Sequence, residues 1–261
     1  MNNLDLSEYM IICDLDGTLL TSKGFVSNKT ADILKYCKLS GCHIGYITAR
    51  SRSKKNISLL KDLPCDFIAF YNGATIYAEN QLLENNALPY QDSNYILQRL
   101  SFDYPKLLID VYQEPWVFSN IRCEICNRRS GEIKTCTIDN LPTIDVQRIR
   151  LKSQQLTSIP LEQYMTSESI FYRTISGDAI IVQKNATKGH ATIIASEYFD
   201  IPTSQMIAFG DDISDIDMIN TVGTGVAMGN AHYELKTIAD FITETNDDNG
   251  IASWIKKYLI K

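Results

Sequence analysis

The chain has 261 residues, 44% of them hydrophobic and 21% charged, with a formal net charge of -6 at pH 7. Its basic residues are scattered, so we expect no nucleic-acid partner. No apolar run approaches the roughly 20 residues of a membrane span, and the N-terminal segment lacks a basic flank and an apolar signal core. We therefore expect no membrane partner and a cytoplasmic protein, either a monomer or a small homo-oligomer.

The seven cysteines agree with a reducing compartment. Their number is odd, and Cys13 and Cys65 adjoin apolar segments, as free buried thiols do. The pair in "CEIC" (123–126) and Cys136 could be taken for part of a zinc site, but no fourth ligand stands at a suitable spacing. We expect neither a disulfide framework nor zinc.

The first third of the chain contains continuous apolar runs of the length of strands covered on both faces. These runs are 9–13, 43–47 and 67–71. Helical segments are expected between them, one with Ile33, Leu34 and Cys37 on its apolar face and the other over 52–62. Ser27 or Asn28 is the expected N-cap of the first helix. Strands that alternate with helices predict right-handed crossovers and a parallel sheet.

The same alternation returns after about residue 186. The expected elements, in order, are a helix with Ala191, Ile194, Ala195 and Tyr198 on one face, a strand at 206–209, a helix from Ser214, strands at 225–228 and 241–243, and a final helix. Residues 81–184 break the pattern with strand-like pieces and few helices, as in an antiparallel α+β unit. We therefore expect a core made of 1–80 and 185–261 and an inserted second domain over 81–184.

Two aspartates follow the first predicted strand, in "IICDLDGTLLT" (11–21). Side chains repeat every two residues in an extended chain, so Asp14 and Asp16 leave the strand on the same side, close together. Like charges at that distance repel. The pair is reasonable if a cation neutralises it or if one member keeps a proton.

Other polar residues also stand where apolar runs end. Thr48 follows the second strand, Asp211 follows the strand at 206–209, and Lys188 begins the helix that re-enters the core. In an open parallel sheet the carboxyl ends of the strands form the ligand-binding edge. This set fits phosphoryl transfer: Asp14 and Asp211 hold Mg²⁺, Asp14 attacks phosphorus, and Asp16 gives and takes the proton.

The motifs "DLDGTLL" (14–20), "ITAR" (47–50), "TKG" (187–189) and "GDDISD" (210–215) resemble, in order and spacing, the four motifs of the haloacid dehalogenase superfamily. The segment 208–231 is similar to the Cof-type sugar-phosphatase branch, subclass IIB. The resemblance implies an α/β fold, a Rossmann-like parallel-sheet core with an inserted α+β cap domain. It also implies a Mg²⁺-dependent phosphatase that hydrolyses a small phosphorylated metabolite, such as a sugar phosphate, through an aspartyl phosphate.

The resemblance also assigns roles to single residues. It implies that Asp14 is the nucleophile and Asp16 the general acid and base, and that Thr48 and Lys188 hold the phosphoryl group. The metal site implied by the family pattern comprises Asp14, the backbone carbonyl of Asp16, the Asp211 side chain, and Asp215 through a metal-bound water.

Substrate contacts are expected at Asn72, Arg50, Asp212 and Ser214. The branch usually has Asn where this chain has Ser214 and a small residue where it has Asp212. For Ser214 we favour a structural role, a capping box with Asp217. Arg50 lies either in solvent at a helix start or on a distal group of the substrate. In the second domain Arg128, Arg129 and Arg150 are candidates for substrate selection.

One glycine-rich segment and the fold itself leave room for other classes of function. The glycines of "GTGVAMG" (223–229) resemble a dinucleotide-binding loop, but they surround a late strand instead of following the first one. A phosphomutase-like enzyme or a degenerate phosphate-binding protein on the same fold is the alternative. The presence of both Asp14 and Asp16 argues against simple binding, because binding needs no proton-transfer carboxylate beside the nucleophile.

Overall fold

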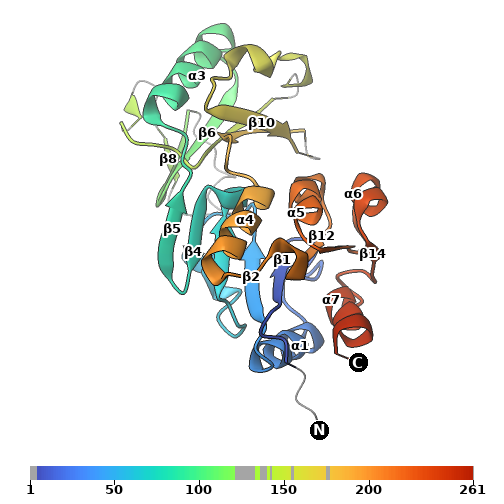
Figure 1. Ribbon diagram of the computed structural model, residues 1–261. Helices are drawn as coiled ribbons and strands as arrows, with labels where there is room; N and C mark the ends of the chain where they lie inside the picture. The colour runs from blue at the N-terminus through green and yellow to red at the C-terminus, as the bar shows by residue number, and fades with distance from the viewer. Residues whose placement is uncertain are drawn as a thin grey trace. The chain divides into compact units, whose positions relative to one another are not determined.

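The computed structural model describes residues 5–120, 133–135, 140–141, 143–153, 156–174 and 177–260 (Figure 1). The chain divides into two compact units. The first comprises Met1–Arg50, Asn56–Glu84 and Thr187–Lys261, and the second comprises Ser51–Lys55 and Asn85–Ala186. The role of the segment 81–184 as a cap domain stays a prediction.

The first unit is built around an eight-stranded sheet with the order β14-β13-β12-β1-β2-β3-β4-β5. Its strands are β1 (Met10–Cys13), β2 (His43–Ile47), β3 (Phe67–Phe70), β4 (Thr75–Ala78), β5 (Gln81–Asn85), β12 (Met206–Gly210), β13 (Thr224–Ala227) and β14 (Phe241–Ile242). From β14 to β3 neighbouring strands pair in parallel, and β4 pairs antiparallel with β3. The expected parallel-sheet core is confirmed.

Helices alternate with the parallel strands, and the last helix follows β14. They are α1 (Asn28–Leu39), α2 (Lys54–Ser58), α4 (Lys188–Phe199), α5 (Ile216–Thr221), α6 (Tyr233–Ile238) and α7 (Gly250–Trp254). As expected, α1 buries Ile33, Leu34 and Cys37, and the Ser27 side chain caps it. α1 packs against α7, and α4 packs against α5. Right-handed crossovers that run in opposite directions from β1 put these two helix pairs on opposite faces of the sheet.

Some local predictions were wrong. The helix expected over 52–62 is limited to α2, because Leu59 and Leu60 bond to carbonyls three residues back and the chain tightens into turns. Tyr198 is exposed and contacts the neighbouring Phe199 ring, while small side chains face the core from α4. Cys65 is exposed in the loop before β3, where its thiol contacts the Phe67 carbonyl.

The second unit has a six-stranded sheet with the order β10-β11-β9-β6-β7-β8. Its elements are α3 (Tyr90–Asp103), β6 (Leu108–Gln113), β7 (Trp116–Ser119), β8 (Ile133–Thr135), β9 (Arg148–Lys152), β10 (Ser169–Arg173) and β11 (Ala179–Gln183). Apart from the parallel pair β7 and β8, the recorded strand pairs are antiparallel. Ile96 and Leu100 of α3 share a buried core with Ile109 and Ile149 of the sheet. The unit is of the expected α+β class.

In the sheet of the first unit, the order in which the chain adds strands reverses at β1. This strand pairs with β2 on one side and with β12 on the other. Strands β2 and β3 follow β1 along the chain, whereas β12 arrives after the whole second unit. The gap between β1 and β12 is therefore a topological switch point, where open α/β sheets bind ligands. Among the described residues, no helix has the length and apolarity needed to cross a membrane.

Candidate active site

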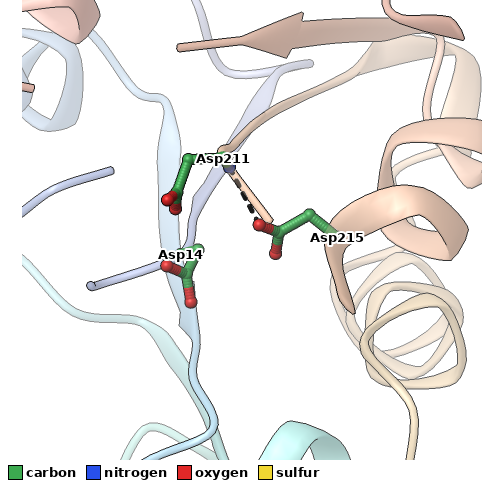
Figure 2. A group of neighbouring side chains, drawn as sticks. All are labelled: Asp14, Asp211 and Asp215. Atoms are coloured by element: carbon green, nitrogen blue, oxygen red, sulfur yellow. Dashed lines mark hydrogen bonds between the residues drawn. The ribbon is translucent and has the colours of Figure 1, made fainter. Parts of the chain in front are cut away.

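Three carboxylates meet at this switch point. Asp14 directly follows β1, Asp211 directly follows β12, and Asp215 lies one turn further on, in the short 3₁₀ turn Ile213–Asp215. One oxygen atom from each lies within 4.8 Å of the others (Figure 2). Asp14 and Asp215 are buried and Asp211 is half-buried. Oxygen ligands that converge from separate segments at this distance suit a divalent cation.

The loop backbone and short side chains hold two of these carboxylates. The Asp215 Oδ2 atom accepts hydrogen bonds of 2.9 Å from the backbone N–H groups of Asp211 and Asp212; Figure 2 shows the first. The Thr18 hydroxyl donates to Asp211 Oδ1 at 2.8 Å. Gly17 has a φ of +79°, and a Cβ atom there would lie 2.2 Å from Asp211 Oδ2. The glycine and threonine of "DGT" therefore make room for Asp211 and orient it.

Lys188 balances part of this negative charge. Its Nζ atom donates to Asp14 Oδ1 at 2.7 Å and also bonds to Asp215 Oδ1, and the residue is only 2% exposed. Thr187 caps α4, and the Asp217 carboxylate accepts the Gly189 N–H at 2.8 Å. Burial alone would lower the pKa of Lys188, but the two carboxylates outweigh it, so the pKa is raised and the ammonium stays charged.

One ammonium does not neutralise three carboxylates. Burial raises the pKa of Asp14 well above its usual value, against the opposing effect of Lys188. Burial and the neighbouring Asp215 raise the pKa of Asp211 to about 7. A bound divalent cation would remove most of this cost of ionisation. The donor set and its excess negative charge therefore fit the metal that the sequence predicts.

Asp16 and Arg50 form a separate ion pair beside this cluster. The Arg50 Nε atom donates to Asp16 Oδ2 at 2.6 Å, and Nη2 donates to Oδ1 at 2.5 Å. The Asp16 side chain is 60% exposed and the Arg50 side chain 25%. Arg50 was expected either in solvent or on the substrate, and its contact with Asp16 was not expected. The sequence does not show that the loops after β1 and β2 adjoin.

Thr48 and Asn72 lie together at the end of β2. Thr48 is fully buried, and its carbonyl accepts the backbone N–H of Asn72 at 2.8 Å. Asn72 is 4% exposed and belongs to the turn Tyr71–Gly73, in which all three residues have positive φ. A Cβ atom at Gly73 would lie 2.6 Å from the Thr187 carbonyl. The turn thus contacts the start of α4, next to Lys188.

The expected capping box at Ser214 was wrong. Asp212 is the N-cap of the turn Ile213–Asp215, its side chain accepts the Ile213 N–H at 2.8 Å, and Asp215 completes the box. Ser214 is half-buried within this turn. The carboxylate expected to partner Ser214, that of Asp217, instead bonds to Gly189 and Met218. The N-cap is therefore Asp212, two residues before the expected Ser214.

The remaining candidates belong to the second unit or lie outside the described residues. Arg150 forms an ion pair with Asp178. Arg128, Arg129 and the "CEIC" segment lie outside the described residues. Thr18 and Asp217 are contacts of the site to which the sequence analysis gave no such role. Thr18 had a signal, since it lies within the first motif, but the contact of Asp217 with α4 depends on tertiary packing.

Comparison with known proteins identifies the family. Residues 11–255 match the sequence model of the haloacid dehalogenase-like hydrolases. The chain belongs to this family. The expected superfamily and the expected enzyme class, phosphoric monoester hydrolase, are confirmed.

Relatives extend over nearly the whole chain. A Haemophilus influenzae protein is 29% identical over 259 residues, which cover 93% of this chain and 95% of the relative. The 5-amino-6-(5-phospho-D-ribitylamino)uracil phosphatase YitU of Bacillus subtilis is 25% identical, covering 98% of this chain and 99% of the relative. A solved subclass IIB sugar phosphatase of the same superfamily has a TM-score of 0.85 at 21% identity, covering 97% of this chain and 100% of that one. At that identity the likeness establishes the fold.

Proposed function

We propose that this protein is a Mg²⁺-dependent phosphatase that hydrolyses a small phosphomonoester through an aspartyl phosphate at Asp14. One observation carries the proposal: the Asp14 carboxylate lies at the sheet switch point, 2.7 Å from the Lys188 ammonium and among two further carboxylates. In phosphoryl transfer the protein contributes mainly the positioning of the reacting groups and the neutralisation of their charge. This cluster of residues can supply both. Family membership supports the reaction class.

In the first step an Asp14 oxygen attacks phosphorus, and the bond from phosphorus to the substrate's ester oxygen breaks. Asp16 gives its proton to that oxygen, so the leaving group departs as an alcohol. Lys188 stays positively charged beside the Asp14 carboxylate and stabilises the charge on the phosphoryl oxygens. The Thr48 hydroxyl, at the end of β2, is the proposed further donor to these oxygens.

In the second step water attacks the phosphorus of the aspartyl phosphate. Asp16, now ionised, takes a proton from the water, and the bond from phosphorus to Asp14 breaks. Inorganic phosphate leaves, and both aspartates return to their starting states. The exposure of Asp16 supports its part in both steps, because it must reach an alcohol and a water molecule.

The residues proposed to hold Mg²⁺ are Asp14, Asp211 and the backbone carbonyl of Asp16, with Asp215 acting through a water ligand. When bound, the ion would neutralise the crowded carboxylates and the charge on the phosphoryl oxygens. Oxygen donors throughout this set favour Mg²⁺ over the softer metals that prefer sulfur or nitrogen ligands.

The proposed substrate is a sugar phosphate or a related small metabolite in the cytoplasm. YitU, whose name describes a phosphorylated ribityl compound as substrate, supports this class. Free thiols at Cys13, Cys37 and Cys42 support a reducing compartment. The proposed catalytic residues all belong to the first unit, which supports a substrate-selecting cap role for the segment 81–184.

The proposal is tested by measuring hydrolysis of p-nitrophenyl phosphate and of a panel of sugar, nucleotide and cofactor phosphates, with Mg²⁺ and with a chelator. We expect turnover that needs the metal, and none from Asp14→Asn, which keeps the size of the side chain but loses the nucleophile. Binding without turnover would indicate a degenerate phosphate-binding protein. Transfer of the phosphoryl group to a second sugar position would indicate a phosphomutase.

A further inference from the structure

Arg50 holds both oxygens of the proposed general acid and base. Its Nε and Nη2 atoms donate to Asp16 Oδ2 and Oδ1 at 2.6 and 2.5 Å, the parallel geometry in which a guanidinium grips a carboxylate. Asp16 lies past the end of β1, on a loop, and its side chain is 60% exposed. An exposed side chain of this kind would otherwise sample several rotamers.

Arg50 is itself held at its backbone and at its head group. Its Nη1 atom donates to Asn56 Oδ1 at 3.1 Å, and Asn56 is only 7% exposed. Its backbone N–H donates to the Thr48 hydroxyl at 3.1 Å, and its carbonyl accepts the Tyr71 N–H at 3.0 Å. The guanidinium is therefore fixed relative to the end of β2, and it transmits that position to the loop after β1.

We propose that Arg50 is a positioning residue for Asp16: it aims the Asp16 carboxyl group at the leaving oxygen when Asp16 carries its proton, and at the attacking water when Asp16 is ionised. The inference rests on the proposed function, because it presumes that Asp16 transfers the proton. It differs from the sequence-based expectation that Arg50 binds the substrate. Three of the five guanidinium N–H donors, one on each nitrogen, already bond to Asp16 and Asn56.

The two roles for Arg50 predict different dependence on the leaving group. An alkyl alcohol is a poor leaving group and needs the Asp16 proton, whereas p-nitrophenolate hardly does. The ratio kcat/KM includes every step up to formation of the aspartyl phosphate, so slow hydrolysis of that intermediate does not mask the contrast. Misplacing Asp16 should therefore lower kcat/KM for the alkyl phosphate selectively.

The experiment compares Arg50→Gln, Asp16→Asn and the double variant with the wild type in saturating Mg²⁺, using an alkyl phosphate and p-nitrophenyl phosphate. General acid catalysis of about 10²–10⁴-fold sets the upper limit of the loss. We expect Arg50→Gln to lose tenfold or more, on the order of one hydrogen bond to a charged group, with the alkyl phosphate. With p-nitrophenyl phosphate we expect a loss of about twofold at most.

The double variant decides whether Arg50 acts through Asp16. We expect Arg50→Gln to cost nothing further once Asp16 is Asn, since residues that act as a unit are not additive. Arg50→Lys keeps the charge but not the fork and should recover part of the loss. Lys61→Gln, which removes an exposed positive charge from the same part of the sequence, is the matched control and should behave as wild type.

Several results would overturn the inference. An increase of KM by the same factor for both substrates, or a loss that persists in the Asp16→Asn background, would make Arg50 a substrate-binding residue. Arg50→Gln with wild-type constants would make the pair incidental. A wild type that hydrolyses neither substrate would refute the proposed function and the inference together, whereas an active wild type without the leaving-group contrast would refute the inference alone.

Discussion

Each unit of the molecule contains a lysine that contacts a buried aspartate, and the surroundings of the two contacts differ. In the second unit Lys152 donates to Asp110 Oδ2 at 2.5 Å, and Arg150 pairs with Asp178 in the same one-to-one way. In the first unit Lys188 contacts both Asp14 and Asp215, and Asp211 lies within the same cluster. The first unit therefore carries an excess of negative charge that its own side chains do not balance.

The two kinds of contact have different explanations. A balanced pair of opposite charges on a sheet needs no ligand, because each charge is neutralised by its partner. Crowded buried carboxylates cost folding free energy unless a cation binds, so their presence indicates a ligand. The excess of carboxylates at the switch point, more than the number of ion pairs, is the reason for proposing that the chemistry takes place in the first unit.

The sharpest test of this comparison replaces each lysine by methionine. We expect Lys188→Met to lower turnover of p-nitrophenyl phosphate by about 10²–10³-fold or more, the effect of removing one preorganised charge contact from a reaction site. We expect Lys152→Met to keep turnover within about twofold and to lose about 1–3 kcal/mol of stability, because it leaves the Asp110 carboxylate without its ammonium partner. Steady-state kinetics and urea denaturation measure the two effects.

The Lys188→Met comparison needs a check on folding, since that variant also leaves buried carboxylates unpaired. Circular dichroism shows whether the variant is folded. The measurement is made with Mg²⁺ present, because the metal replaces the positive charge that Lys188→Met removes. A folded Lys188→Met enzyme with normal turnover would contradict the proposed role of the cluster. A loss of turnover in Lys152→Met without loss of stability would move part of the chemistry to the second unit.

A smaller effect is expected from pH on the metal-free protein. Folding raises the pKa of Asp211 from 3.8 to about 7. A raised carboxyl pKa means that the folded state binds the proton more tightly, so this contribution to stability is present below about pH 4 and lost as pH rises through about 7. Mg²⁺ binds the ionised carboxylate, so it should raise the melting temperature by more at about pH 8 than at about pH 5.5.

Thermal denaturation with chelator and with Mg²⁺ at the two pH values measures this difference, which we expect to be a few degrees. Asp211→Asn removes the titrating group and should flatten the dependence. Asp212→Asn changes a neighbouring carboxylate that caps the following turn and serves as the matched control. An equal metal effect at both pH values in the wild type would contradict the raised pKa of Asp211.

Much of the first unit could be predicted from the sequence because its signals are local. Continuous apolar runs identify β1, β2 and β3, and the residues that end the strands come together because parallel strands share one carboxyl edge. The meeting of Asp14, Asp211 and Lys188 was expected from that topology, whereas Asp215 was implied only by the family resemblance. The resemblance of the four motifs to a known family added the roles of single residues.

The contacts that escaped prediction depend on distances between loops. Nothing in the spacing of Asp16 and Arg50 indicates that one guanidinium grips both carboxylate oxygens. The expected partner of Ser214 was Asp217, which instead crosses to the backbone of Gly189 in another helix. A cap box depends on which of several nearby acidic residues reaches the turn first, and here Asp212 does.

The smallest predicted effect concerns Arg150, which forms one of the balanced ion pairs of the second unit with Asp178. If the second unit selects substrates, Arg150→Gln should change the ratio of kcat/KM between two natural phosphate esters by about tenfold, the contribution of one charged hydrogen bond. The rate with p-nitrophenyl phosphate should stay nearly constant.

Asp178→Asn breaks the same ion pair from the other side but keeps the guanidinium, so it is the matched control. A changed ranking in Arg150→Gln alone assigns substrate recognition to the guanidinium. The same change in both variants would mean that the ion pair shapes the sheet, and no change in either would mean that selectivity lies in first-unit residues such as Asn72, Asp212 and Ser214.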